Sequence, residues 1–414
     1  MPKIGVAMTY TLDNAAKSRL DDYFAQIGTH LQRKEQRASF ATYAFGILGE
    51  GGRKSVEPIA ARAFGEPRET QRAHDRLLHF LKDSPWSDRD VRREAARYVT
   101  RALHEQDPIT VWIVDDTGFL KQGDHSVGVQ RQYTGTAGKI TNCQVGVSLC
   151  VANRTEHVPL DFELYLPQQW LNDEERRKEA RIPADQVFKT KPDLAIDMIA
   201  RAIANELPGD IVLADAAYGT SSGFRDALRS YGLDFAVAVN ATTGVWLLDA
   251  KERRRGAAIG VQKLGIELGL QAFRRVTWRT GTRGKLASRF CFRRVKPAHD
   301  DSSEPKDREA LWLVIEWPYD ETKPTKFALT TLPRCMSKKQ IVRILKERWR
   351  TELAYEELKG ELGLDHYEGR SFPGWHHHVS VVLCCYAFIV AERVRHFPPS
   401  VRGKAQGNAL RIAA

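Results

Sequence analysis

The sequence predicts a mixed α/β protein that begins with helices and carries a β-rich segment late in the chain. Three patterns support this fold class. Residues 12 to about 105 are helical in pattern, residues 106–240 alternate short apolar strands with helical stretches, and residues 241–335 contain strand-like runs separated by polar loops. Such alternation is typical of an α/β core. A chain of 414 residues has room for two or three domains, or for one large core with an insertion.

The composition is that of a globular soluble protein with a basic surplus. Hydrophobic residues make up 42% of the chain and charged residues 28%, which are ordinary values. Lysine and arginine number 63 against 52 aspartates and glutamates, which gives a net charge of +11. This surplus favours a polyanionic partner and makes nucleic acid a better candidate than an acidic metabolite.

Cysteine usage and the apolar stretches predict a cytoplasmic protein with no membrane span. The six cysteines, at positions 143, 150, 291, 335, 384 and 385, form no CxxC pair, and a disulfide scaffold is not expected at this size. The N-terminus carries Asp13 and no sustained apolar core, unlike a signal peptide. Residues 379–391, the longest apolar stretch, are too few to cross a bilayer, so we expect a buried helix there.

Residues 1–105 form the predicted helical N-terminal domain, with helix boundaries marked by Pro58, Pro67 and Pro85. The stretch KSVEPIAARAFGEPRETQRAHDRLL is compatible with a helix-turn-helix-like pair that docks on DNA. For each of these helices the alternative is an ordinary packing domain whose charges form a solvated face.

Residues 106–240 supply the first part of the predicted core. The runs ITVWIV, CQVGVSLCVA and VPLDFELYL follow one another as an antiparallel meander. The helical stretch KPDLAIDMIARAIANE then leads into the apolar run DIVLAD, which ends at Asp215. A helix in SSGFRDALRSYG and a strand in DFAVAV complete the alternation.

The remaining chain divides into three segments. Residues 241–335 form a predicted β-rich insertion built from VTWRTG, SRFCFRRV, ALWLVIEW and KFALTTL, and its loop KPAHDDSSEPKDRE is long and hydrophilic enough to be mobile. Residues 336–396 are helical and return to the core, beginning with KKQIVRILKERWRTELAYEELKGELGL. Residues 397–414 form a basic flexible tail.

Carboxylates stand at the ends of two apolar runs, WIVDD and IVLAD. Because neighbouring side chains of a strand point to opposite faces, only one of Asp115 and Asp116 follows the inward face of its strand. Either these aspartates form turns and caps, or they meet as metal ligands at the strand ends. A third carboxylate, Glu352, lies on a later helix in RWRTELAYEELK.

Arg348, Glu352 and Lys359 share one narrow face of that helix, because their spacing places them at about 0°, 40° and 20° around its axis. This stripe offers one metal ligand between two cations that can bind phosphate. Three converging carboxylates suit Mg²⁺ or Mn²⁺, which prefer oxygen ligands. Two such ions roughly 4 Å apart activate a water or a 3′-hydroxyl and stabilise the leaving oxygen of a phosphodiester.

The chain resembles the DDE transposases of bacterial insertion sequences, which have a ribonuclease H-like core; within them it is similar to the insertion-sequence-four superfamily and its seven-oh-one branch. The resemblance covers about residues 20–395 and is carried by DDTGFLKQGDHSVGVQRQYTG, GKITNCQVGVSL, ADAAYGTSSGFR and ERWRTELAYEELKGELGLDHYEGRSFPGWHHH. The superfamily signature is tyrosine, two residues, arginine, three residues, glutamate, six residues and lysine. Arg348, Glu352 and Lys359 match it, whereas Leu345 stands in place of the tyrosine and offers no hydroxyl.

The resemblance implies that Asp116, Asp215 and Glu352 are both the catalytic residues and the metal ligands. The family's first aspartate directly precedes a threonine, and Asp116 precedes Thr117, so the resemblance selects Asp116 over Asp115. Asp115 is then expected to turn toward the other face and brace the loop.

The resemblance also implies contacts to DNA. Arg348 and Lys359 would orient the scissile phosphates, whereas Lys139, in the loop GTAGKIT, is either a phosphate contact or part of an ordinary solvated turn. In the family the β-rich insertion helps to hold hairpin ends of the transposon, often through a tryptophan that stacks on a displaced base. The candidates, for each of which core packing is the alternative, are Trp278, Trp312 and Trp317.

The implied protein is a cytoplasmic DNA transposase that associates with the nucleoid when bound to DNA. It would use Mg²⁺, with Mn²⁺ able to substitute, to cut the ends of an element and to transfer the 3′-hydroxyl ends to target DNA. Its partner would be double-stranded DNA, as transposon ends and as target, held by a homodimer. Two alternatives stay open: a domesticated DNA-binding protein without the reaction, and a ribonuclease H-like nuclease without strand transfer.

His376, His377 and His378 are the remaining conspicuous group. Three consecutive helical residues splay over about 200° and cannot all bind one zinc ion. We expect them at a helix start, where they contact polar groups or DNA phosphate.

Overall fold

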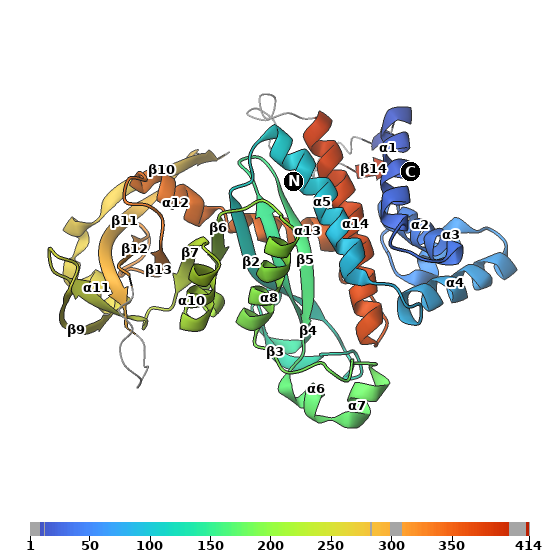
Figure 1. Ribbon diagram of the computed structural model, residues 1–414, viewed down its shortest axis with the longest axis horizontal. Coiled ribbons are helices and arrows are strands. Elements are labelled where there is room, and N and C mark those ends of the chain that lie inside the picture. Colours follow the sequence, from blue (N-terminus) through green and yellow to red (C-terminus); the bar gives the residue numbers. More distant parts are fainter. Residues whose placement is uncertain (1–8, 12, 282–283, 299–308, 397–410, 414) are drawn as a thin grey trace.

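A computed structural model describes residues 9–11, 13–281, 284–298, 309–396 and 411–413 (Figure 1). Within these residues the N-terminal part is helical, as predicted, and a short parallel pair joins β1 (Thr9–Thr11) to β14 (Arg411–Ala413). The helices are α1 (Asn14–Gly28), α2 (Lys34–Leu48), α3 (Val56–Ala63), α4 (Pro67–Lys82) and α5 (Asp88–Gln106).

A twelve-stranded mixed sheet forms the centre of the described molecule. Five of its strands form the core, in the spatial order β5 (His157–Tyr165), β4 (Lys139–Ala152), β2 (Val111–Leu120), β6 (Ile211–Ala214) and β7 (Asp234–Val239). β2 and β5 each pair antiparallel with β4, whereas β6 is parallel to β2 and β7 is parallel to β6. Three antiparallel strands followed by two parallel strands make a ribonuclease H-like core, which confirms the predicted fold class.

The meander contains one strand that the sequence pattern did not predict. β3 (Gln130–Thr134) pairs antiparallel with the first residues of β4. Its sequence, QRQYT, has a single large apolar side chain, so it lacks the alternation that signals a strand. β3 therefore forms because it pairs with β4, and its own sequence pattern does not predict it.

Helices cover both faces of the core strands (Figure 1). α8 (Lys191–Ala204) packs on β4 and β5 on one face, and α13 (Trp349–Gly360) packs on β2 and β5 from the other. α5 and α14 (Phe372–His396) pack against each other and along β5. Short helices in the connections are α6 (Gln168–Asn172), α7 (Glu174–Glu179), α9 (Ala216–Gly219) and α10 (Ser222–Ser230).

The β-rich segment continues the core sheet. β13 pairs antiparallel with β7, so the strands of the segment extend the same sheet from its parallel edge. The segment comprises β8 (Gly244–Leu248), β9 (Arg254–Gly260), α11 (Val261–Leu268), a 3₁₀ turn (Leu270–Ala272), β10 (Arg274–Gly281), β11 (Gly284–Pro297), β12 (Leu311–Trp317) and β13 (Lys326–Thr330).

The helical stretch after residue 336 begins as two helices that follow each other closely. α12 (Lys338–Lys346) ends before Glu347, and α13 begins at Trp349, so Glu347 and Arg348 form the junction. Arg348 keeps a helical backbone at the N-cap of α13. The predicted face shared by residues 348, 352 and 359 is therefore preserved.

The apolar C-terminal stretch is a buried helix, as predicted, but it is longer than expected. α14 has 25 residues and is by length and composition able to span a membrane, so the expectation that the stretch is too short was wrong. Its apolar window is 89% buried inside the protein, as in the core helix of a globular fold.

The three histidines of α14 serve packing. His376 donates from Nδ1 to the carbonyl of Phe372, and His377 stacks on Trp86 at 3.9 Å between ring centroids. His378 contacts the hydroxyl of Tyr43 at 2.9 Å. All three are buried, so they contact polar groups of the protein itself and are not presented to DNA phosphate.

Three expectations lie largely outside the described residues: the mobile character of the loop 296–309, the flexible tail from 397, of which only β14 is described, and the extreme N-terminus.

Gly219 gives a test of how tightly the end of α9 is packed. A Cβ atom at Gly219 would overlap the carbonyl oxygen of Ala238 in β7, whereas one at Gly223 would meet only Ser221 Oγ at 3.9 Å. We expect Gly219→Ala to lower the free energy of unfolding by about 2 kcal/mol, because overpacking forces the backbone to shift. Gly223→Ala is the matched control in the neighbouring helix, and its free energy of unfolding, measured by chemical denaturation, should equal or slightly exceed that of the parent. Equal denaturation curves for the two variants would contradict the tight packing at Gly219.

Candidate catalytic site

The register of the two parallel strands brings the aspartates of both apolar runs to one place. Val114 of β2 pairs with Ala214 of β6, so Asp115, the next residue of β2, lies beside Asp215, which directly follows β6. Asp215 ends its strand and caps α9, where its Oδ1 accepts a hydrogen bond of 2.9 Å from the N–H of Ala217. The prediction that the first strand ends at Asp115 and Asp116 was wrong, because both residues lie within β2, which pairs with β4 as far as Leu120. Only Asp215 follows the end of its strand.

Of the two neighbouring aspartates of β2, Asp115 is the one that points toward α13. Its carboxylate accepts a hydrogen bond of 2.6 Å from Nη1 of Arg348. Ser148, its cross-strand partner on β4, contacts the hydroxyl of Tyr355 in α13 at 2.6 Å, which identifies this face of the sheet as the α13 face. Asp115 is buried, with a relative exposure of 8%.

Asp116 points to the opposite face, toward α8 and α9. Its Oδ2 accepts hydrogen bonds of 3.1 Å from Nζ of Lys191 and 3.1 Å from the hydroxyl of Tyr218. The strand alternation therefore separates the two neighbouring aspartates, and the geometry favours Asp115 over the predicted Asp116 as the partner of α13.

Glu352 lies in the first turn of α13 and is exposed, with its side chain 67% accessible. Its one contact among the described residues is with Nη2 of Arg348, at 3.4 Å. Arg348 thus stands between the carboxylates of Asp115 and Glu352. No group of three acidic, histidine or cysteine side chains in the described residues is close enough to hold a metal ion as the side chains stand.

Negative charge at the site exceeds positive charge. Four carboxylates, at positions 115, 116, 215 and 352, face two cations, Arg348 and Lys191. Burial, opposed by Arg348 and reinforced by Asp215, raises the pKa of Asp115 to about 7. Burial also raises the pKa of Asp215, with Asp116 adding to the effect. A surplus of oxygen donors in a poorly solvated place fits a hard divalent cation.

The ammonium of Lys359 forms hydrogen bonds within the protein. Its Nζ donates to the hydroxyl of Thr117 at 2.8 Å and to the carbonyl of Gly118 at 2.7 Å, and it lies over the ring of Phe119. Burial lowers its pKa. The structure brings Lys359 to β2 beside the site but with its ammonium bound to β2. Lys139, at the start of β4, is exposed.

The tryptophans of the β-rich segment pack in the protein. Trp317 is buried and donates to the carbonyl of Glu321, Trp312 packs edge-on against Phe292, and Trp278 packs edge-on against Phe290. The more exposed ring beside the site is Trp349, 38% exposed, which follows Arg348 and stacks with Arg279.

Lys191, Tyr218, Ser148 and Tyr355 were missed by sequence reasoning. Each comes from a different element and reaches the aspartates only through the fold. Tyr218, Ser148 and Tyr355 lie in the motifs ADAAYGTSSGFR, GKITNCQVGVSL and ERWRTELAYEELKGELGL that carry the resemblance, whereas Lys191 lies outside them.

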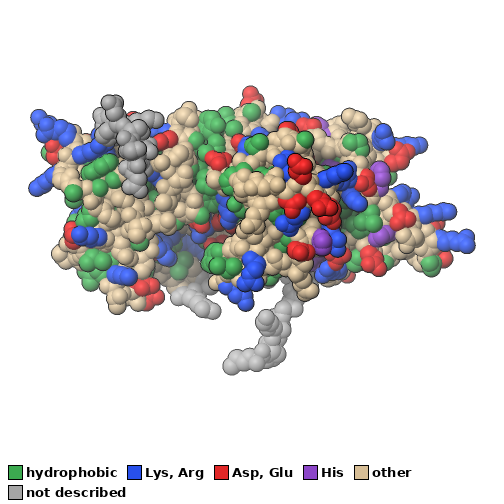
Figure 2. All heavy atoms as spheres, turned by 90° about the horizontal axis from the view of Figure 1, so that it is seen from below, with side chains coloured by type: hydrophobic (Ala, Val, Ile, Leu, Met, Phe, Trp, Pro, Cys, Tyr) green, Lys and Arg blue, Asp and Glu red, His purple; other side chains and the backbone are tan. Residues whose placement is uncertain are grey.

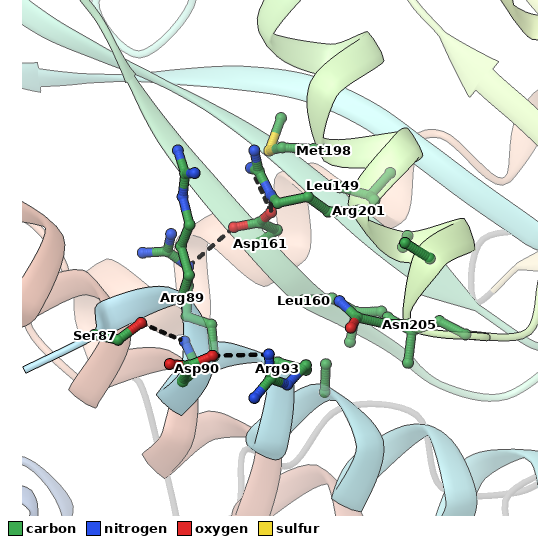
Figure 3. A pocket seen from close by; sticks show the side chains of 15 residues that line it. Ser87, Arg89, Asp90, Arg93, Leu149, Leu160, Asp161, Met198, Arg201 and Asn205 are labelled. Atoms are coloured by element: carbon green, nitrogen blue, oxygen red, sulfur yellow. Dashed lines mark hydrogen bonds and ion pairs between the residues drawn. The ribbon is translucent and has the colours of Figure 1, made fainter. Parts of the chain in front are cut away.

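A second group of charged side chains shows what a balanced network looks like in this protein. A cleft of about 350 Å³ between α5 and α8 is lined by Arg92, Asp161 and Arg201, among others (Figure 3). Asp161 is held by Arg201 at 2.7 Å and by Arg92 at 2.9 Å. Because these acidic groups are paired with arginines, the cleft lacks the charge surplus of the strand-end site.

Family comparison agrees with this topology. The family described as DDE superfamily endonuclease matches residues 26–285, which is more than half of the chain. The chain belongs to this DDE superfamily. A second family description, transposase DDE domain, matches residues 189–388 and so includes Asp215 and Glu352.

Individual relatives of this DDE protein are distant or partial. A probable transposase for insertion sequence element IS701 from Microchaete diplosiphon is 31% identical over 173 residues, which span 42% of each chain. Among solved structures, a piggyBac transposase synaptic complex with hairpin DNA aligns with 96% of this chain and 76% of that chain, at 11% identity and a TM-score of 0.43.

The raised pKa of Asp115 predicts a pH-dependent stability of the metal-free DDE protein. The folded protein retains a proton between the ordinary value of 3.8 and about 7 that the unfolded chain releases, so stability falls as pH rises through this window. Asp115→Asn removes the ionisation, and we expect it to unfold about 2 °C higher than the parent at pH 8 in chelator, with a smaller gap at pH 5. Glu356→Gln, an exposed change on α13, is the control; a gap that widens toward low pH would contradict the assignment.

Proposed function

We propose that this DDE protein is an insertion-sequence transposase that cuts the ends of its element and joins the resulting 3′-hydroxyl ends to target DNA. The observation that carries the proposal is Arg348, which contacts Asp115 and Glu352 and feels the charge of Asp215, at the end of the parallel strand pair of a ribonuclease H-like sheet. Family membership and the partial relative support it.

We assign the metal ligands to Asp115, Asp215 and Glu352. The first of these replaces Asp116, because Asp115 faces α13 and Asp116 faces α8. Mg²⁺, with Mn²⁺ as a substitute, would supply activation of the attacking oxygen and stabilisation of the leaving oxygen. The three carboxylates are suited to it because they are oxygen donors with too few cations beside them.

The protein's own residues would position the DNA. Arg348 has a planar guanidinium that can bind a phosphate by two hydrogen bonds. Lys191 holds the Asp116 side chain in place from the other face. Lys359 fixes the end of β2 against α13 and thereby holds the carboxylates in register.

Double-stranded DNA is the proposed partner, and α3 with α4 the proposed docking element. The two helices are joined by residues 64–66 and pack together, as in a helix-turn-helix. α4 exposes Arg68, Gln71, Arg72 and Arg76 opposite its buried Leu77 side. Lys and Arg side chains project from this end of the molecule in Figure 2.

Two DNA ends must be held together for strand transfer, so we propose a homodimer in the DNA complex, acting in the cytoplasm at the nucleoid. The rival readings, a DNA-binding protein without the reaction and a nuclease without strand transfer, differ from this proposal in measurable products.

Cleavage of a duplex carrying the inverted repeats of the element tests the assignment of ligands. We expect Asp115→Asn, Asp215→Asn and Glu352→Gln each to lower the cleavage rate in Mg²⁺ at least about a hundredfold. Asp116→Asn should reduce it less, and Glu356→Gln, one turn along α13, should not reduce it. Full activity of Asp115→Asn beside an inactive Asp116→Asn would reverse the assignment, and cleavage without joined product would favour the nuclease.

Binding of the same duplex without metal tests the role of α4. Arg68 and Arg72 form no ion pair or hydrogen bond among the described residues, so both guanidiniums are available to phosphate or base edges. We expect the Arg68→Ala, Arg72→Ala double variant to bind about tenfold more weakly, with a salt dependence reduced by about two phosphate contacts. Arg97→Ala, an exposed arginine of α5, is the control; an equal loss in both proteins would place the DNA elsewhere.

A further inference from the structure

Arg348 occupies the centre of the acidic site. Its Nη1 binds Asp115 at 2.6 Å and its Nη2 contacts Glu352 at 3.4 Å. Burial lowers its pKa, but the charges of Asp115, Asp215 and Glu352 raise it overall above the ordinary value, so all three proposed metal ligands act on one guanidinium. Among the described residues, it is the only cation that contacts Asp115 or Glu352 directly.

A guanidinium and a divalent cation compete for such a place. Both neutralise carboxylates, and an ion bound by Asp115 would lie close to the guanidinium that already donates to its Oδ2, so the two positive charges repel each other. The guanidinium carries one positive charge and a divalent ion carries two, so Arg348 alone offsets only one of the three negative charges. The carboxylates therefore stay in place without metal, but they are only partly neutralised.

Arg348 also stands where it is able to leave. It is the N-cap of α13, at the junction that interrupts α12 and α13, and its side chain is 31% accessible. Glu352, its second partner, is exposed and held by nothing else among the described residues. A phosphate that approaches from solvent offers the guanidinium two oxygens in the planar geometry that it binds best.

We propose that Arg348 is a resident cation of the metal-free site, and that a DNA phosphate draws it away from the carboxylates and so raises their affinity for the divalent ion. This inference rests on the proposed function. It adds to that function an order of events: metal loading is held back until DNA is bound. Without bound DNA, the site then holds little of the divalent metal that cleavage requires.

Linkage makes the proposal quantitative. If DNA raises metal affinity by some factor, metal raises DNA affinity by the same factor. Bound phosphate also supplies metal ligands of its own, so part of this coupling is independent of Arg348. Removal of Arg348 should therefore tighten metal binding to the free protein and shrink the coupling without abolishing it.

The test measures Mn²⁺ binding to the full chain, with and without a duplex of the element's end. Electron paramagnetic resonance gives the concentration of free Mn²⁺. We expect Arg348→Gln to bind Mn²⁺ about tenfold tighter than the parent in the absence of DNA, and to gain less from added DNA. Arg348→Lys, which keeps a cation there, should behave more like the parent. Lys339→Gln, an exposed change on α12, controls for the lost positive charge.

Outcomes separate the inference from the function on which it rests. Equal or weaker Mn²⁺ binding by Arg348→Gln, in a variant whose thermal unfolding matches the parent, overturns the role of Arg348 alone. Mn²⁺ binding that is unaffected by Asp215→Asn and Glu352→Gln, with or without DNA, overturns the metal site and with it the proposed function.

Discussion

The parallel pairing of β2 with β6 is the constraint on which the candidate site depends. It places the residues that follow Val114 and Ala214 side by side where the parallel pairing ends, so that Asp115 and Asp215 lie close together without any flexible element between them. α13 crosses the same face and is tied to the sheet by Tyr355 and Lys359, which sets where Glu352 emerges. A shift of this pairing by one residue would exchange Asp115 for Asp116 and move the charge to the other face.

Electrostatics explains why the arrangement is both stable and reactive. Carboxylates that share a poorly solvated place repel one another, and the protein offsets this with one arginine on the α13 face and one lysine on the α8 face. The offset is incomplete, in contrast with the cleft beside α5, where Asp161 is held by two arginines. A site left with surplus negative charge is suited to bind cations, whereas a balanced network is suited to hold helices together.

The sequence predicted most strands and helices well, but it did not predict the face of the sheet toward which individual side chains point. The apolar runs predicted where both strands lie and where β6 ends, and the helical spacing of residues 348, 352 and 359 predicted one face, but β2 continues past Asp115 and Asp116 to Leu120. The choice between Asp115 and Asp116 could not be predicted, because it depends on which face α13 covers. The break at Glu347 and the pairing of Lys191 with Asp116 depend on packing between elements far apart in the chain. β3 and the continuity of β13 with β7 arise in the same way.

The most direct measurement of the central claim is the position of Mn²⁺ by anomalous diffraction from crystals of the protein bound to a duplex of its element's end. We expect an anomalous peak coordinated by oxygens of Asp115, Asp215 and Glu352, with the Arg348 guanidinium moved from Asp115 onto a DNA phosphate. A peak on the α8 face, bound by Asp116 with Arg348 still paired to Asp115, would contradict it.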